Sequence, residues 1–131
     1  MITIKDKIIN HALNISCEIF DADRDSVTSN KNRSSETIKA KRMFIYYLYK
    51  YMEVTHNGMN KYFATINHAS SIHHVNKFHF ELQRYNDVKK DFDRFLTEMK
   101  RFNVYGGGFY EKRKEIKKLL EELNKVKNEK N

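Results

Sequence analysis

The first apolar stretch of this chain has the spacing of one helix face, which predicts an amphipathic helix that ends near Asn14. The members of this stripe are Ile4, Ile8, Ile9, Ala12 and Leu13. We expect Ser16 to cap a short second helix that runs through Phe20, since serine is a preferred N-cap residue. Residues 23–35 are polar and basic, which predicts a loop.

Three longer helices are predicted after this loop, and the absence of proline permits each of them. The first covers about residues 35–53, with basic residues in its first half and aromatic residues in its second. The second covers 67–84 with Asn67 as its N-cap, and the third covers 86–102. On the second helix we expect an apolar side with His79 partly buried on it: Ile72, Val75, His79 and Leu82. On the third, the expected apolar face is Val88, Phe92, Phe95, Leu96 and Met99.

A run of three glycines at 106–108 separates residues 1–105, the expected main domain, from a charged C-terminal segment at 109–131. Within that segment, 110–128 is predicted to be a helix with an apolar seam. This seam is too short for an independently stable coiled coil, so we expect it to dock on the domain or to pair with a second copy. The homodimer would use Ile116, Leu119, Leu123 and Val126, with Leu120 beside them.

Basic residues outnumber acidic ones by 25 to 17, and their distribution is uneven. Residues 24–50 hold seven basic and two acidic side chains, and residues 59–80 hold Lys61 and Lys77 with no acid. Such a surface suits a phosphate backbone, although a solvated basic face is the simpler alternative. No apolar run approaches the length of a membrane span, and Cys17 is the single cysteine. A cytoplasmic protein without a membrane partner is therefore expected.

A helix-turn-helix is predicted from a short helix at 59–64, a turn at 65–66 and the helix from Asn67 onward. The start of the second helix would enter the major groove of DNA, where uncharged hydrogen-bonding side chains read base edges. The alternative is an ordinary N-cap followed by an exposed polar face. The candidate base readers are Asn67, His68, Ser70, Ser71 and His74.

Several motifs, in this order and spacing, resemble the C-terminal DNA-binding domain of the bacterial chromosomal replication initiator DnaA. Asn67-His68-Ala69-Ser70-Ser71-Ile72-His73-His74 is similar to the family's Asp-His-Thr-Thr-Val-hydrophobic-His-Ala segment. Ile15-Ser16-Cys17-Glu18-Ile19-Phe20 and Val88-Lys89-Lys90-Asp91-Phe92 resemble two further family segments. The resemblance covers residues 5 to about 102 and implies an all-α, compact helical domain with a helix-turn-helix of the DnaA C-terminal or Trp-repressor type.

The resemblance also implies residue roles. Lys39 lies where the family probes the minor groove with an arginine, and Lys41 and Arg42 lie near its next Arg-Gln. Asn67, His68, Ala69 and Ser70 replace the family's major-groove readers, with Asn67 in place of an acid, so recognition of the initiator's own box is not expected to carry over. The family's ATPase domain has no counterpart here. The full set expected at phosphates or the minor groove is Lys31, Arg33, Lys39, Lys41, Arg42, Lys61 and Lys77.

Catalytic and metal chemistry find little support in the sequence. No two of the six histidines are three or four residues apart, which disfavours a zinc site on one helix face. Cys17 beside Glu18 is a poor site for a thiolate, so we expect a buried filler. We therefore expect a protein that is not an enzyme and holds no cofactor or metal.

Three functions remain open from the sequence. The first is sequence-preferring binding of double-stranded DNA. The resemblance implies that such a protein is a phage or mobile-element regulator of replication or transcription, in the cytoplasm of a bacterial cell or a phage-infected host. The second is a protein-interaction module that uses the basic surface or the C-terminal helix. The third is single-strand binding through the tyrosines of residues 46–51, although aromatic residues at helical spacing are more often core.

Overall fold

The computed structural model describes residues 3–29, 34–102 and 118–123, and the described chain is helical without a β-strand. This agrees with the all-α class expected from the sequence. The helices come in the order α1 (Ile4–Phe20), α2 (Arg24–Thr28), α3 (Ser35–Tyr51), the 3₁₀ helix η1 (Asn57–Lys61), α4 (His68–Arg84) and α5 (Asn86–Arg101). The predicted glycine hinge at 106–108 lies outside the described residues.

Helix α1 is continuous, so the predicted break near Asn14 is wrong. Thr3 and Asp6 form a capping box at its start, in which each side chain accepts a hydrogen bond from the other residue's backbone N–H. Ser16 does not cap a second helix, because its hydroxyl donates to the carbonyl of Ala12 inside α1 at 2.9 Å. Because the apolar residues along one face of α1 are buried, the helix continues beyond Asn14 and Ser16 to Phe20.

The predicted loop at 23–35 is also partly wrong, because it contains α2. Asp23 caps this short helix by accepting from the Ser26 backbone N–H at 3.2 Å. Arg24 donates to the side-chain oxygens of Asn10 and Asn14 on α1. These bonds and the completely buried Val27 hold α2 against α1 and α3. The helix is therefore stabilised by tertiary contacts, which its own polar sequence does not indicate.

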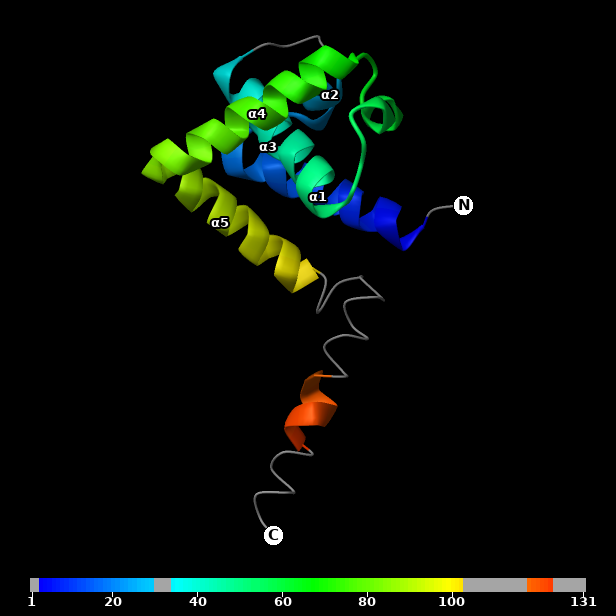
Figure 1. Ribbon diagram of the computed structural model, residues 1–131, viewed down its shortest axis with the longest axis vertical. Coiled ribbons are helices and arrows are strands. Elements are labelled where there is room, and N and C mark those ends of the chain that lie inside the picture. Colours follow the sequence, from blue (N-terminus) through cyan, green and yellow to red (C-terminus); the bar gives the residue numbers. More distant parts are fainter. Residues whose placement is uncertain (1–2, 30–33, 103–117, 124–131) are drawn as a thin grey trace.

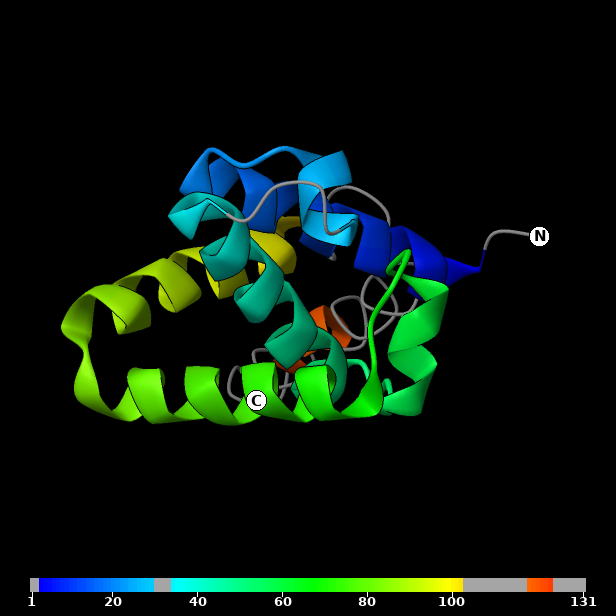
Figure 2. The same cartoon turned by 90° about the horizontal axis from the view of Figure 1, so that it is seen from above.

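Helix α3 lies at the centre of the domain, as Figures 1 and 2 show. In the view of Figure 2 it runs between α1 and α4, while α5 returns from the far end of α4 toward α1. Six consecutive residues of α3, from Met43 to Leu48, are buried, because neighbouring helices cover it on more than one side. The predicted bounds of α3, α4 and α5 agree with the structure to within two residues.

An aromatic cluster joins α3, α4 and α5. The rings of Tyr46 and Phe78 lie 4.8 Å apart, and Tyr47 meets Phe95 edge-on at 4.9 Å. Phe92 contacts both Tyr46 and Phe78. This packing confirms the predicted apolar face of α5 and places Tyr46 and Tyr47 in the core, where they cannot stack on bases.

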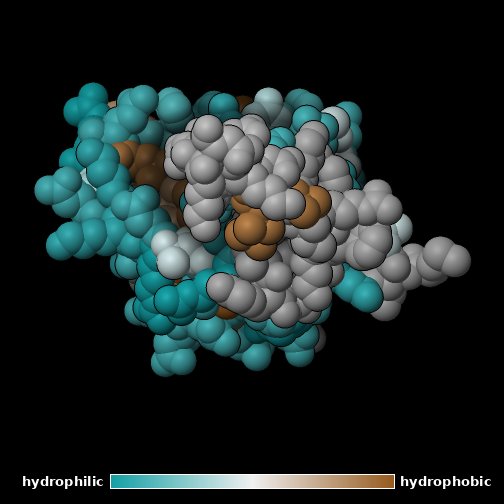
Figure 3. Space-filling model, turned by 90° about the horizontal axis from the view of Figure 1, so that it is seen from below, coloured by the Kyte–Doolittle hydropathy of each residue, from teal (hydrophilic) through white to brown (hydrophobic). Residues whose placement is uncertain are grey.

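None of the described helices is both long and apolar enough to cross a membrane. On the face drawn in Figure 3 the coloured surface is mostly hydrophilic, with small separate hydrophobic areas. Residues 118–123 are helical, as predicted for this part of the C-terminal segment, and their three leucines are exposed: Leu119, Leu120 and Leu123. Ile116 and Val126, the other members of the predicted seam, lie outside the described residues.

Candidate nucleic-acid interface

The candidate interface is built around the start of α4. Asn67 caps this helix as predicted, because its side-chain oxygen accepts from the Ser70 backbone N–H at 2.7 Å. The first turn of α4 contains no acidic residue, and the sequence from Val54 to Phe80 contains no Asp or Glu. The positive end of the α4 dipole therefore faces solvent without a carboxylate from its own neighbourhood in the sequence.

The segment before α4 differs from the predicted helix at 59–64. The helical turn is η1, which begins at Asn57 and ends at Lys61, and residues 62–67 connect it to α4. The predicted two-residue turn at 65–66 is thus part of a longer connection. Gly58, within η1, has no positive φ, and its backbone N–H donates to the Thr55 hydroxyl at 2.9 Å.

Four of the predicted base readers lie on the outside of the first turn of α4. Asn67, His68 and Ala69 are exposed and Ser70 is half-buried. Ser70 and Asn67 border a hollow of about 590 Å³ that is also lined by Lys41 and Asn60. The structure therefore brings a predicted phosphate-binding lysine from α3 to the same hollow as two predicted base readers from α4.

The other two predicted base readers face the protein. Ser71 is completely buried and its hydroxyl lies 2.7 Å from Nδ1 of His56. His74 is half-buried, and its Nδ1 accepts from the Nε–H of Arg42 at 3.4 Å. Burial and the nearby cation Arg42 lower the pKa of His74 to about 4, so this ring is neutral near pH 7.

The buried face of α4 is accordingly different from the one predicted. The buried residues are Ser71, Val75 and Phe78, while Ile72 and Leu82 are only partly buried. His79 is exposed and bonded to Gln83, so its expected partial burial is wrong. Polar residues occupy this face because partners from elsewhere in the chain satisfy them, which helix periodicity alone does not show.

The predicted cations fall into different surroundings. Lys77 is exposed on α4, with its Nζ 5.8 Å from the Phe80 ring centre. Lys39 is exposed, but the space beside it is also lined by Asp87 and Asp91. Arg42 forms an ion pair of 2.9 Å with Glu81, and about four-fifths of each side chain is buried. Lys31 and Arg33 lie outside the described residues.

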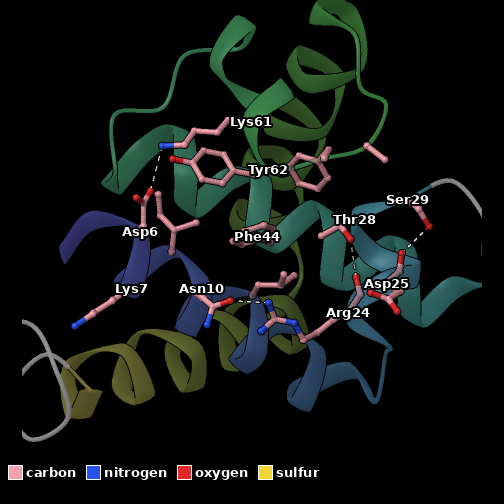
Figure 4. A pocket seen from close by; sticks show the side chains of 14 residues that line it. Asp6, Lys7, Asn10, Arg24, Asp25, Thr28, Ser29, Phe44, Lys61 and Tyr62 are labelled. Atoms are coloured by element: carbon pink, nitrogen blue, oxygen red, sulfur yellow. Dashed lines mark hydrogen bonds and ion pairs between the residues drawn. The ribbon is translucent and has the colours of Figure 1, made fainter. Parts of the chain in front are cut away.

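A larger groove, of about 1030 Å³, opens between α1, α2 and the residues after η1 (Figure 4). Two of the cations in this groove are engaged by partners within the chain, as the dashed lines at Lys61 and Arg24 in Figure 4 indicate. Lys61 lies 3.2 Å from Asp6, and Arg24 donates to Asn10 at 2.6 Å. A phosphate would therefore compete with Asp6 for the ammonium group of Lys61.

Two residues at the interface were not identified from the sequence. His56 stacks on Tyr49 with ring centres 4.3 Å apart and meets His68 edge-on at 5.4 Å. Burial, and secondarily the neighbouring His68, lowers the pKa of His56. Asn57 bonds His68, with its side-chain oxygen 3.0 Å from Nδ1. In the sequence both residues lie between two predicted helices, with no signal of their contact with α4.

No group of three or more His, Cys, Asp or Glu side chains that could hold a metal occurs in the described part of the chain. Cys17 is buried, as predicted, and burial raises the pKa of its thiol to about 11. Comparisons with protein-family models, curated proteins and solved structures found no match to this chain.

Proposed function

We propose that this protein binds double-stranded DNA with a sequence preference, with the start of α4 in the major groove. The observation that carries the proposal is an exposed first turn without a carboxylate, which offers Asn67, His68 and Ser70 beside Lys41. Neutral hydrogen-bonding groups suit base edges, and the flanking cations suit phosphates. The resemblance of residues 5 to about 102 to the DnaA C-terminal domain supports the same proposal. On the basis of this resemblance we also propose that the protein is a phage or mobile-element regulator of replication or transcription.

In this arrangement different residues of α4 contact different parts of the DNA. Lys77 lies nine positions after His68, which is about 14 Å along the helix axis at 1.5 Å per residue. The major groove is about 12 Å wide, so a helix inserted by its first turn carries Lys77 to the phosphates at the groove edge. Ser71, His74 and Arg42 take no direct part in this proposal, because their polar groups are engaged inside the protein.

A titration of duplex DNA at several salt concentrations tests the proposal. With about five phosphates neutralised, the logarithm of the association constant should fall with the logarithm of salt concentration at a slope of about −4 to −5. Lys77→Ala should reduce the size of this slope by about one, whereas Lys100→Ala, an exposed lysine at the far end of α5, should leave it unchanged. The double variant Arg42→Met/Glu81→Leu should also leave it unchanged, because it removes a guanidinium and the carboxylate paired with it together.

Base reading requires a separate comparison between a preferred site and random duplex DNA. The preferred site is obtained by selection from a random duplex library. His68→Ala should cost about 1–3 kcal/mol on that site and less on random DNA, while His79→Ala, further along α4, should cost little on either. Absence of duplex binding at 50 mM salt would refute the proposal. Equal losses for His68→Ala on both DNAs would refute base reading.

A second candidate function is binding of another protein through the C-terminal segment. It is favoured by the exposure of Leu119, Leu120 and Leu123 on a helical stretch. Replacing Leu119 and Leu123 by serine distinguishes the two functions, because the proposed DNA surface does not include these leucines. Duplex binding should survive the double substitution, and loss of it would assign the interaction to the C-terminal segment.

A further inference from the structure

The ring of His68 is held at two points by residues that come before α4. Asn57 contacts Nδ1 through its side-chain oxygen at 3.0 Å. The ring of His56 meets the His68 ring edge-on at 5.4 Å, and His56 is itself fixed by stacking on Tyr49 and by the bond to buried Ser71. An exposed histidine at the start of a helix is therefore positioned before any ligand arrives.

The contact with Asn57 also decides where the proton of the neutral ring lies. A carboxamide oxygen only accepts hydrogen bonds, so Nδ1 of His68 must carry the hydrogen that it donates. The remaining nitrogen, Nε2, then has a free lone pair and can only accept. Among the described residues no hydrogen bond to this nitrogen is found, and the His68 side chain is exposed.

We propose that Asn57 is a specificity-determining positioning residue, which makes Nε2 of His68 an acceptor for the exocyclic amino group of adenine or cytosine in the major groove. The inference rests on the DNA-binding function proposed above. Adenine N6 and cytosine N4 are the amino donors of that groove, whereas guanine O6 and thymine O4 repel a second acceptor. Asn57 determines the choice of base without touching it.

Asn67 complements this arrangement. Its side-chain oxygen already accepts from the Ser70 backbone N–H at 2.7 Å, so its amino group is the part most available to a ligand. The first turn of α4 thus offers an acceptor from His68 beside a donor from Asn67. A base edge with the opposite pattern, an amino group next to a carbonyl or ring nitrogen, would satisfy both.

The proton position is measured in the free protein by nitrogen-15 spectra of the imidazole rings at pH 8, where an ordinary imidazole is neutral. We expect His68 in the Nδ1–H form in the native protein and in Asn57→Asp, which keeps the accepting oxygen. Asn57→Ala should shift the ring toward the Nε2–H form that free imidazole side chains favour. Asn86→Ala, which removes the same amide from the exposed start of α5, is the matched control and should change nothing. A native Nε2–H form would overturn the inference.

The consequence for DNA is measured on the selected site by deleting one amino group at a time, with purine replacing adenine or 2-pyrimidinone replacing cytosine. At one position the native protein should lose roughly tenfold in affinity, the value of one hydrogen bond. Asn57→Ala should lose less than twofold from the same deletion, and Asn57→Asp and Asn86→Ala should behave like the native protein. If Asn57→Ala keeps the tenfold sensitivity, the inference is wrong while DNA binding stands. If the native protein binds no duplex, both are wrong.

Discussion

The ion pair between Arg42 and Glu81 should contribute measurably to stability, because it joins α3 to α4 in a largely buried position. The two groups lie 2.9 Å apart, with 17% and 19% of their side chains exposed. Glu81→Gln removes the negative charge but keeps an oxygen that can accept from Arg42. Breaking a fully buried pair costs about 3–5 kcal/mol. Since both side chains keep partial contact with water and the amide retains one bond, we expect a loss of about 1–2 kcal/mol.

The chain contains a matched control for this substitution. Glu98 pairs with Arg101 on α5 at 3.1 Å, but this pair lies within one helix and its side chains are 36% and 67% exposed. Glu98→Gln removes the same charge from the same type of pair and should cost less than about 0.5 kcal/mol. The difference between the two variants isolates the effect of burial from the effect of charge.

Urea unfolding followed by circular dichroism at pH 7 measures both losses. For a domain of this size, about 1–2 kcal/mol lowers the midpoint by roughly 1 M urea without a change in slope. The double variant Arg42→Met/Glu81→Leu should recover most of the loss, because an apolar pair leaves no unpaired charge. Equal midpoints for Glu81→Gln and Glu98→Gln, or further destabilisation in the double variant, would refute the reasoning.

Three further predictions concern other parts of the chain. Cys17, which is buried and has a thiol pKa raised to about 11, should react with iodoacetamide at pH 8 only after unfolding, and rapid alkylation of the native protein would contradict this. His74, whose pKa is lowered to about 4, binds a proton in the unfolded chain before the folded one, so stability should fall as the pH drops from about 6.5 to about 4. His74→Gln should flatten that dependence in urea titrations, and an unchanged dependence would exclude His74 as its cause. If Leu119, Leu120 and Leu123 pair with a second copy, the full chain should sediment as a dimer at tens of micromolar and a chain ending at Tyr105 as a monomer. Two monomers would exclude the homodimer.

Much of the helical framework follows from the sequence. The bounds of α3, α4 and α5 are predicted to within two residues, because each has a clear cap or a long apolar stripe and no proline interrupts it. Asn67 is recognisable as an N-cap since its side chain acts within its own helix. Cys17 is predicted to be a buried filler because its neighbour Glu18 makes a thiolate unfavourable, and it is buried. Helix bounds and caps, which depend on residues within one or two helical turns, can therefore be predicted from the sequence.

Contacts between distant segments decided what the local pattern could not. The polar residues Asn14 and Ser16 do not end α1, because its apolar stripe continues against α3 and α5. Helix α2 forms in a polar stretch because Arg24 reaches Asn10 on α1 and Val27 enters the core. The first helix of the predicted helix-turn-helix is displaced to Asn57–Lys61 and shortened to a 3₁₀ helix.

At the candidate interface, too, some properties follow from the sequence and others only from the tertiary structure. The sequence by itself determined that the start of α4 is uncharged, hydrogen-bonding and free of acids, since these are properties of residue type. Only the tertiary structure decided which of its side chains are available. Ser71 turns inward to His56, whereas His68 remains exposed and is oriented by Asn57. The physical reason is that a polar side chain can be buried only where a partner satisfies it. Ser71 finds that partner in His56, 15 residues away in the chain, and the residue that orients His68 lies 11 residues away.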